Sequence, residues 1–192
     1  MKNIGFFGGS FDPIQFGHIN LAIQIKEILK LDKILFCPTN ISPFKTKNPP
    51  KARAQDRLKM LKLAIEGLNG FEICEIEIQR EDISYTIDTL NEIKSMGNIR
   101  LIVTDDALNS FHLWKEYKQI LKIATLLVGV RLSDINHFKS ENFTLSSKNF
   151  IKTKIFEISS TAIRERLKNK MYCYHLLPKE VLDYIYKRKI YL

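Results

Sequence analysis

GGSFDPIQFGHINLA, residues 8–22, joins an apolar run to an amphipathic segment near the start of the chain. The run at residues 3–7 predicts a short strand, and the helical spacing of apolar residues over 19–29 predicts a helix. Two glycines directly after a strand let a ligand approach the backbone closely, because they carry no Cβ. Ser10 adds a hydroxyl, and His18 lies where the helix begins and can donate to phosphate oxygens. The stretch therefore indicates either an anion-binding turn between a strand and a helix or a tight turn without a ligand.

The composition is that of an ordinary globular chain, long enough at 192 residues to bury one packed core. Its 30 Lys and Arg against 21 Asp and Glu give a formal net charge of +9, which favours anionic partners. The lysines are spread along the chain, without an Arg-rich tract or an interleaved aromatic and basic pattern. Charge alone does not choose among nucleotides, phosphorylated metabolites, nucleic acid and a membrane surface, and a solvated lysine-rich surface accounts for most of the excess. Without a basic tract we expect no nucleic acid as partner.

Cysteine usage and hydropathy indicate the redox state and the cellular compartment in which we expect the chain. Cys37, Cys74 and Cys173 are widely separated without C-x-x-C spacing, so we expect reduced thiols and no disulfide framework. The histidines have no mutual metal-ligand spacing, and no protein-held metal is expected. No window approaches 18 uninterrupted apolar residues, and the N-terminus lacks a signal-peptide pattern. We expect a cytoplasmic protein that does not bind membranes; the sequence is compatible with a homo-oligomer.

Helical and strand patterns alternate along the rest of the chain. Strands are expected at 34–37, 71–78, 100–104, 125–130 and 154–158, and helices at 54–68, 86–95, 114–122, 159–168 and 178–187. Residues 132–154 are polar with weak periodicity and predict a long loop or irregular insert. This alternation predicts an α/β fold: a Rossmann-like, doubly wound, mostly parallel sheet with helices on both faces and a small helical part at the C-terminus. No linker divides the chain, so we expect one domain over residues 1–192.

Two distant stretches carry a resemblance to a known family. GGSFDPIQFGH resembles the signature loop of the nucleotidyltransferase superfamily, G-G-[ST]-F-D-P-x-H-x-G-H, whose members transfer a nucleotidyl group from ATP or CTP and release pyrophosphate. ISSTAIR, residues 158–164, matches the family's second signature, I-S-S-T-x-I-R, at every position. Ser159 or Ser160 is the expected N-cap of the next helix, whose start is then an anion site with hydroxyls. Alone, this string is more typical of a capped surface helix; the pair of motifs favours a nucleotide site.

The resemblance implies an ATP site built from both stretches, with Mg²⁺ bound together with the ATP. Its residues would be Gly8, Gly9, Ser10, Phe11, Gln15, His18, Thr104, Asp106, Ser160, Thr161, Ile163 and Arg164. The catalytic residues it implies are His18, Gln15, Lys45 and Arg164. They would act by alignment and by neutralising the departing pyrophosphate, not as general bases.

A narrower resemblance, to the nicotinate-nucleotide adenylyltransferases, concerns the second substrate. SYTIDTL, residues 84–90, resembles the segment that holds the pyridine nucleotide in that family, and Trp114 falls where the family stacks an aromatic ring on the pyridine. Core packing is the other interpretation of Trp114. The nicotinate mononucleotide site would comprise Ser10, Lys45, Tyr85, Thr86, Asp106, Trp114 and Arg131. The resemblance implies adenylyl transfer from ATP to nicotinate mononucleotide, giving deamido-NAD and pyrophosphate.

Three positions depart from the family pattern. Gln15 replaces the first histidine, Phe44 replaces the histidine of a P-P-H-K loop that Lys45 otherwise matches, and Thr104 with Asp105 replaces Gly-Ala. A glutamine amide donates a hydrogen bond but carries no charge, so we expect a charge-assisted contact to be lost. Asp12 is expected to be a turn or cap residue. Two alternatives stay open: an adenylyltransferase for another phosphate such as phosphopantetheine, and a degenerate nucleotide-binding protein with weak or no turnover.

Overall fold

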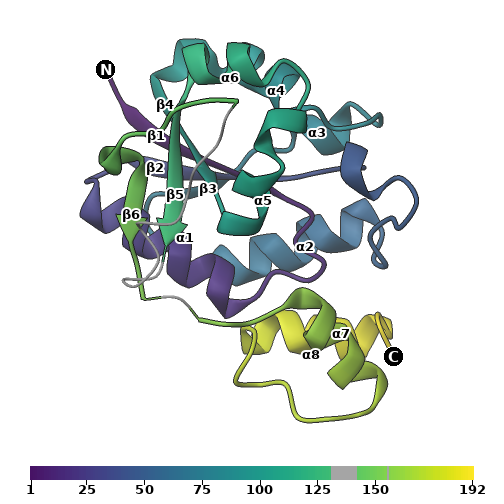
Figure 1. Cartoon of the computed structure of the whole chain (residues 1–192). Coiled ribbons are helices and arrows are strands. Elements are labelled where there is room, and N and C mark those ends of the chain that lie inside the picture. Colours follow the sequence, from purple (N-terminus) through teal and green to yellow (C-terminus); the bar gives the residue numbers. More distant parts are fainter. Residues whose placement is uncertain (131–141, 155) are drawn as a thin grey trace.

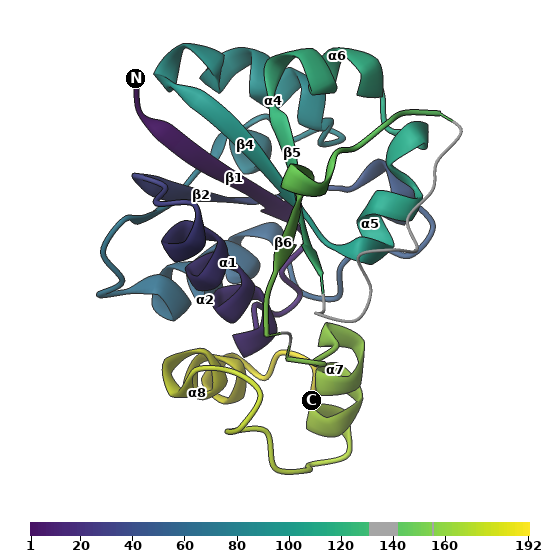
Figure 2. The same cartoon turned by 60° about the vertical axis from the view of Figure 1, so that its left-hand side comes forward.

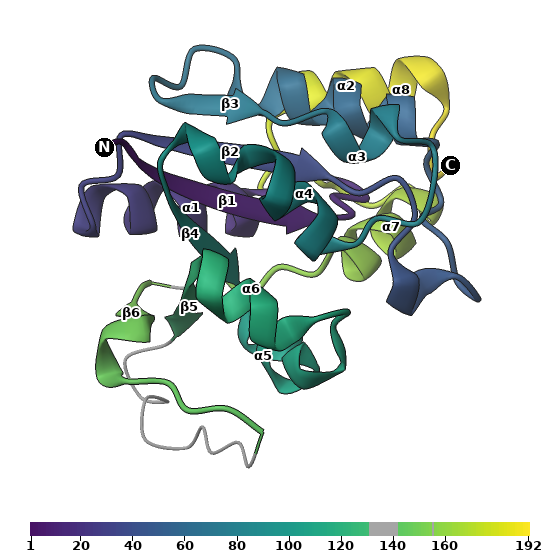
Figure 3. The same cartoon turned by 90° about the horizontal axis from the view of Figure 1, so that it is seen from above.

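The computed structural model describes residues 1–130, 142–154 and 156–192, with the backbone alone described at residues 105 and 106. These residues form a six-stranded sheet with the strand order β3-β2-β1-β4-β5-β6. Each adjacent pair of strands is parallel, and Figure 3 shows the order from above. The strands are β1 (Asn3–Gly9), β2 (Lys33–Pro38), β3 (Phe71–Ile73), β4 (Asn98–Val103), β5 (Thr125–Val130) and β6 (Phe150–Lys152).

Helices cover both faces of the sheet, which confirms the predicted Rossmann-like α/β fold. On one face lie α1 (Phe16–Ile28) and α2 (Ala54–Ile65), and on the other α4 (Thr86–Ile93) and α6 (Tyr117–Ile123), as Figure 2 shows. The C-terminal helices α7 (Ser160–Lys168) and α8 (Lys179–Arg188) lie side by side below the sheet in the view of Figure 1. The short helices are α3 (Ile76–Gln79) and α5 (Asp105–Asn109), with 3₁₀ turns at η1 (Pro43–Lys45), η2 (Lys94–Met96), η3 (Phe111–Leu113) and η4 (Ser147–Asn149).

Two apolar cores, one on each face of the sheet, follow from the alternation of side chains along the strands. In β1, Phe7 joins the core that α1, α2, α7 and α8 complete, while Phe6 joins the core under α4 and α6. In β2, Phe36 likewise joins the core under α1 and α2, and Leu35 joins the core under α4 and α6. Because both faces are covered, each strand is a nearly continuous apolar run. The C-terminal helices therefore share a core with the first helices of the chain.

The structure corrects the strand predicted at residues 71–78. β3 ends at Ile73, and Ile76–Gln79 forms helix α3. The sequence alternates here, but its polar residue Glu77 is as buried as its neighbour Ile78, which the half-exposed strand implied by the alternation does not predict. A short E-I-E-I string fits either period, so the sequence alone did not decide between them.

The last strand of the sheet was also misplaced. β6 lies within residues 132–154, which were predicted as loop, while residues 154 and 156–158, predicted as strand, are irregular. Only three residues pair with β5, too few for a period of two to stand out. Other elements agree with the predictions apart from their ends: the helix predicted at 114–122 begins at Tyr117, and Pro178 is the N-cap of α8 instead of a residue of its first turn.

The sheet reverses its order between two central strands. From β1 the chain moves outward to β2 and β3, then returns to β4 on the other side and continues to β5 and β6. The connections after β1 and β4 therefore leave toward opposite faces, and a crevice opens between them at the carboxyl ends. Cys37, Cys74 and Cys173 are buried free thiols, as expected. In the described part of the chain, no helix has both the length and the apolarity to cross a bilayer.

Candidate functional site

A cavity of about 1130 Å³ opens at the carboxyl ends of β1 and β4. Segments from both faces of the sheet line it: the loop after β1 and the start of α7 from one face, and the start of α4 from the other. Most residues that the sequence pointed to are among its walls. They are Gly8, Gly9, Ser10, Phe11, Gln15, His18, Lys45, Tyr85, Thr86, Thr104, Trp114, Ser160, Thr161 and Arg164. Two motifs far apart in the sequence therefore meet at one cavity.

Three predicted residues stand outside this set. Ile163 is 0% exposed in the apolar core and is not part of the lining, so its side chain does not face the cavity, and a contact with ATP stays a prediction for its backbone alone. Its side chain packs in the core that α7 shares with α1, α2 and α8. Asp106 lies in the first turn of α5, and its side chain lies outside the described residues. Arg131 also lies outside the described residues.

The lining divides into two parts that we name by position. The loop side comprises the lining residues within 8–18, 42–51 and 158–164, and the α4 side comprises those at 77, 84–86 and 114–115. The helices of the loop side pack on the core under α1 and α7, and those of the α4 side pack on the core under α4 and α6. The two parts thus belong to opposite faces of the sheet.

On the loop side, Gln15 is the N-cap of α1. Its Oε1 accepts from the backbone N–H of Gly17, and its Nε2 donates to the carbonyl oxygen of Ile158 at 2.9 Å. A Cβ on Gly17 would stand 2.6 Å from Oε1 of Gln15 and 3.0 Å from the carbonyl oxygen of Phe156, so a larger residue here would displace the Gln15 amide from its cap. The amide that stands where the signature loop has a histidine therefore both lines the cavity and fastens the two motifs together.

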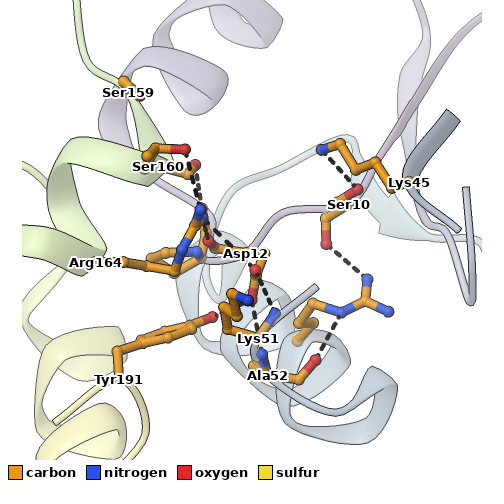
Figure 4. Close-up of polar contacts among 12 residues, drawn as sticks. Ser10, Asp12, Lys45, Lys51, Ala52, Ser159, Ser160, Arg164 and Tyr191 are labelled. Atoms are coloured by element: carbon orange, nitrogen blue, oxygen red, sulfur yellow. Dashed lines mark hydrogen bonds and ion pairs between the residues drawn. The ribbon is translucent and has the colours of Figure 1, made fainter. Parts of the chain in front are cut away.

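Further hydrogen bonds join the two motifs directly, as Figure 4 shows. The hydroxyl of Ser160 donates to the carbonyl oxygen of Pro13 at 2.9 Å, and Nη1 of Arg164 donates to that of Asp12 at 2.6 Å. Nη2 of Arg164 also donates to Oγ1 of Thr161 at 3.0 Å. Ser159 is the N-cap of α7. The start of α7, with its unpaired N–H groups and hydroxyls, is thereby held beside the loop after β1.

Asp12 is the centre of these contacts. Its side chain is 6% exposed, and its carboxylate accepts from the backbone N–H of Lys51 at 2.8 Å and of Ala52 at 3.0 Å. The phenol of Tyr191 donates to Oδ1 at 2.6 Å, and Nη1 of Arg164 lies 3.6 Å from Oδ2. Each carboxylate oxygen thus has partners, as the expected role of Asp12 as a turn or cap residue requires.

Two cations lie beside Ser10. Nη1 of the buried Arg57 donates to the carbonyl oxygen of Ser10 at 2.7 Å, and Nη2 donates to that of Asn40 at 2.9 Å. Burial lowers the pKa of Arg57, which the Asp12 charge opposes. The exposed Lys45, in η1, donates from Nζ to Oγ of Ser10 at 3.2 Å. Arg57 therefore shapes the loop, and Lys45 is the cation that remains accessible to a ligand.

His18 lies in the first turn of α1, at the mouth of the loop. Its ring packs edge-on against Phe11, with centroids 5.2 Å apart, and against Phe7 at 6.2 Å. Aromatic edges on the imidazole limit its rotation. The residue is therefore held with one side on the cavity, where the prediction from sequence placed it.

The α4 side begins at the N-terminus of α4. Tyr85 is the N-cap without a side-chain cap hydrogen bond, and Thr86 is the first helical residue. Nζ of Lys115 lies 4.5 Å from the centroid of the Tyr85 ring and 3.3 Å from a carboxylate oxygen of Asp88. A helix start and a lysine both favour an anionic group of a ligand here. The half-buried Trp114 lines the same part and packs on Phe111, with centroids 5.2 Å apart.

Two departures from the family pattern also line the cavity. Thr104 is the N-cap of α5 with φ −88° and ψ 164°, an extended conformation that any residue adopts. The glycine usual in the family is therefore not needed for the backbone path. Phe44 lies in η1 with 53% of its surface exposed. It supplies an exposed ring where the P-P-H-K loop supplies an imidazole.

Glu77 on α3 is a buried carboxyl group of the α4 side, 2% exposed. The hydroxyl of Thr89 donates to its Oε1 at 2.9 Å. Burial raises the pKa of Glu77, while the hydroxyls of Thr89 and Ser84 and the charge of Arg80 act in the opposite direction. The α4 side thus contains a carboxyl group that has fewer charged donors than Asp12.

Sequence reasoning missed Lys115, Glu77, Arg57 and Tyr191 as parts of this site. Lys115 follows Trp114 directly, and Glu77 stands seven residues before SYTIDTL. Their closeness in sequence to these motifs could have marked them as candidate site residues. Tyr191 gave none, because only the fold brings the end of the chain to Asp12.

The arrangement suits a polyanion on one side and a flat anionic ring on the other. The loop side offers the N-termini of α1 and α7 together with His18, Lys45 and Arg164, while the α4 side offers Trp114 and a helix start. These groups bind and neutralise phosphate oxygens and require no general base.

Comparison with known proteins gives consistent findings. A family model described as cytidylyltransferase-like matches residues 6–166. A Dictyoglomus thermophilum protein named "Probable nicotinate-nucleotide adenylyltransferase" is 38% identical over 202 residues, covering 98% of this chain and 99% of that protein. A Bacillus cytotoxicus protein of the same name is 36% identical over 197 residues, covering 100% of this chain and 99% of that protein.

A solved structure shares the fold over the full length of the chain. The Plasmodium falciparum nicotinic acid mononucleotide adenylyltransferase complexed with NaAD has a TM-score of 0.78 at 18% identity, covering 100% of this chain and 98% of that one. At this identity, the likeness is one of fold.

Proposed function

The chain belongs to the cytidylyltransferase-like family, among its nicotinate-nucleotide adenylyltransferases, and from this premise we propose that it transfers the adenylyl group of ATP to nicotinate mononucleotide. The products are deamido-NAD and pyrophosphate. The observation that carries the proposal is the meeting of residues 8–18 and 158–164 at one cavity, bonded to each other through Arg164 and Ser160. We infer one nucleotidyltransferase domain over residues 1–192, because α7 and α8 share a core with α1 and α2.

On the loop side, the residues act on the triphosphate of ATP. The backbone from Gly8 to Ser10 and the start of α7 receive phosphate oxygens, and His18, Lys45 and Arg164 supply positive charge. A phosphate oxygen of the acceptor attacks the α-phosphorus, the bond from that phosphorus to the β-phosphate bridge breaks, and pyrophosphate leaves with the bonding electrons. Charge builds on the leaving group, which is where these cations stabilise it. The attacking phosphate is already ionised, so no side chain needs to remove a proton.

On the α4 side, the residues hold the pyridine nucleotide. The start of α4, at Tyr85 and Thr86, and the neighbouring Lys115 receive the nicotinate carboxylate, and Trp114 stacks on the ring. A carboxylate gains more from these donors than a carboxamide does, so the acid form is the expected acceptor.

Mg²⁺ is the metal that we propose to accompany ATP. Within the described residues, no three His, Cys, Asp or Glu side chains lie close enough to hold an ion, whereas the loop side presents hydroxyls and cations. This lining fits an ion carried by the phosphate oxygens themselves. When bound there, Mg²⁺ neutralises charge on the triphosphate. The contribution of the chain is to align the two phosphates through the loop and the start of α7.

Pyrophosphate release tests this function. The purified protein is incubated with Mg-ATP and, in separate reactions, with nicotinate mononucleotide, nicotinamide mononucleotide and phosphopantetheine. We expect release with the nicotinate form and much less with the other two. Release with phosphopantetheine alone would identify a different acceptor, and ATP binding without release in any reaction would identify a degenerate nucleotide-binding protein.

A further inference from the structure

Tyr191, the residue before the end of the chain, reaches the base of the loop side. Its phenol donates to Oδ1 of Asp12 at 2.6 Å, across 179 residues of sequence (Figure 4). Burial, followed by the charge of Asp12, raises the pKa of Tyr191, so the phenol stays a proton donor at neutral pH. The contact is therefore a charge-assisted hydrogen bond between the chain end and the phosphate loop.

Tyr191 follows α8, a helix that is anchored in the core. Val181, Leu182 and Ile185 of α8 are fully buried in the core shared with α2. The phenol of Tyr184 donates to Oδ1 of Asp56 on α2 at 2.8 Å. Tyr191 itself follows with φ +64°, in the left-handed region, so the backbone turns sharply after the helix. The phenol is thus held by packing and does not depend on a free chain end.

Asp12 and the ligand of the cavity compete for the same arginine. Arg164 donates from Nη1 to the carbonyl oxygen of Asp12 at 2.6 Å, while the carboxylate Oδ2 lies further away, at 3.6 Å. The carboxylate is occupied by the backbone N–H groups of Lys51 and Ala52 and by the phenol of Tyr191. The phenol and the N–H of Ala52 share Oδ1, and the N–H of Lys51 bonds Oδ2, the oxygen nearer Arg164. These three donors disperse the charge of the carboxylate, so it draws Arg164 less strongly and the guanidinium stays at the cavity wall.

We propose that Tyr191 is a positioning residue: by occupying Asp12, it keeps Arg164 available to the triphosphate of ATP. This inference rests on the proposed function in assigning Arg164 to phosphate. Without the phenol, Oδ1 loses one of its two donors, more of the negative charge of Asp12 is left uncompensated, and the carboxylate draws Arg164, which lies near Oδ2, into a closer ion pair. The effect is specific to ATP, because the acceptor site on the α4 side contains neither residue.

Tyr191→Phe tests the proposal, with Tyr184→Phe as its matched control. Both variants remove a phenol that donates to a carboxylate from the C-terminal part of the chain, over 2.6 Å and 2.8 Å respectively. Asp56, the partner of Tyr184, is not part of the cavity lining. A purely structural role predicts that the two variants behave alike.

The readouts are the melting temperature, the Kd of ATP titrated without acceptor, and the KM values of both substrates. We expect Tyr191→Phe to weaken ATP binding about fivefold or more, with the KM of the acceptor changed by less than about twofold, and Tyr184→Phe to leave both nearly unchanged. In an Arg164→Lys background, the Tyr191→Phe effect on ATP should shrink, because the two residues act through one contact.

Equal Kd values for ATP in the two phenylalanine variants would overturn the proposal. So would a Tyr191→Phe protein that does not fold, because the phenol would then serve folding alone. The ATP titration needs no turnover. A wild-type protein that binds ATP but releases no pyrophosphate with nicotinate mononucleotide would refute the proposed function and leave the inference about Tyr191 to be judged on binding.

Discussion

On the loop side of the cavity, hydrogen bonds join residues 147 and 152 positions apart, from Ser160 to Pro13 and from Arg164 to Asp12. On the α4 side, the walls come from residues 77–115 and are held by ring packing and by the core under α4. The first construction orients Arg164 and the start of α7, because directional hydrogen bonds hold them to the loop after β1. The second provides a shaped apolar surface with a few polar groups.

The two sides also treat a buried carboxylate differently. Asp12 receives two backbone N–H groups, a phenol and a nearby guanidinium, whereas Glu77 has the hydroxyl of Thr89 at 2.9 Å and a pKa that burial raises. The comparison teaches that the loop side is organised around permanent charge, which suits leaving-group stabilisation. The α4 side is organised around shape, which suits the choice of acceptor.

His18→Ala gives the largest expected effect and addresses the loop side. Removal of the imidazole takes away a donor to the departing pyrophosphate, so we expect kcat to fall by about 100-fold or more. The helix and the Phe11 ring remain in place, so the melting temperature should change little. Steady-state pyrophosphate release and thermal unfolding measure the two quantities.

His175→Ala is the control for this variant. His175 is exposed and stacks on Tyr172, with centroids 5.8 Å apart, and is not part of the cavity lining. Its kcat should equal that of the wild type. An unaltered kcat in His18→Ala would show that His18 does not stabilise the leaving group. The loop side would then not be distinguished from the α4 side by a catalytic imidazole.

Trp114→Ala addresses the α4 side and should change a different constant. Loss of the ring removes the stacking surface, so we expect the KM of nicotinate mononucleotide to rise about tenfold while the KM of ATP stays within about twofold. Initial rates with each substrate varied in turn give both constants. A matching rise in both values would mean that Trp114 supports the whole cavity through Phe111, as a core residue does.

Much of the loop side could be predicted from the sequence, because its residues lie in two contiguous strings. GGSFDPIQFGH and ISSTAIR predict a shared site for His18, Ser160 and Arg164, and all three line the cavity. The parallel sheet followed from the alternation of strand and helix patterns. The second role of Gln15, which donates to Ile158, could not be predicted, since it depends on the distance between two segments rather than on a string.

The differences between prediction and structure share a physical cause. β3 and β6 each have three residues, too short to show a period, so the strand patterns around them were assigned wrongly. Ile163 lies between two predicted ligand-binding positions in the motif but on the buried face of α7, because neighbouring helical residues point 100° apart. Tyr191 and Arg57 act through tertiary contacts that no local pattern reveals.

The smallest expected effects are changes in melting temperature for two carboxyl-to-amide variants, Asp12→Asn on the loop side and Glu77→Gln on the α4 side. Because each removes one buried carboxylate, the pair compares the two sides directly. Asp12→Asn replaces one oxygen by an NH₂ group that cannot accept from the N–H of Lys51 or Ala52, and it discharges the partner of Arg164. We expect its melting temperature to fall at pH 7 by several degrees, as the loss of buried charge-assisted bonds requires.

Glu77→Gln should change stability in the opposite direction. Burial raises the pKa of Glu77 above its ordinary value of 4.5, so the folded state binds the proton more tightly than the unfolded chain does. Ionisation of this group therefore costs stability as the pH rises from the unfolded pKa through the folded one. Glutamine keeps an acceptor for Thr89 and carries no charge, so we expect its melting temperature to exceed that of the wild type by a few degrees at pH 7.

The pH dependence separates this explanation from a general gain in packing. Below the unfolded pKa, Glu77 is protonated in both states, so the advantage of Glu77→Gln should vanish as the pH falls toward 4.5. Glu72→Gln is the control, because Glu72 is exposed and pairs with Lys33 at 2.7 Å, away from the groups that act on Glu77, and its small effect should not follow this curve. A Glu77→Gln melting temperature below that of the wild type at pH 7 would show that the ionised carboxylate has stronger donors than the hydroxyl of Thr89, and the two sides would then treat their buried charges alike.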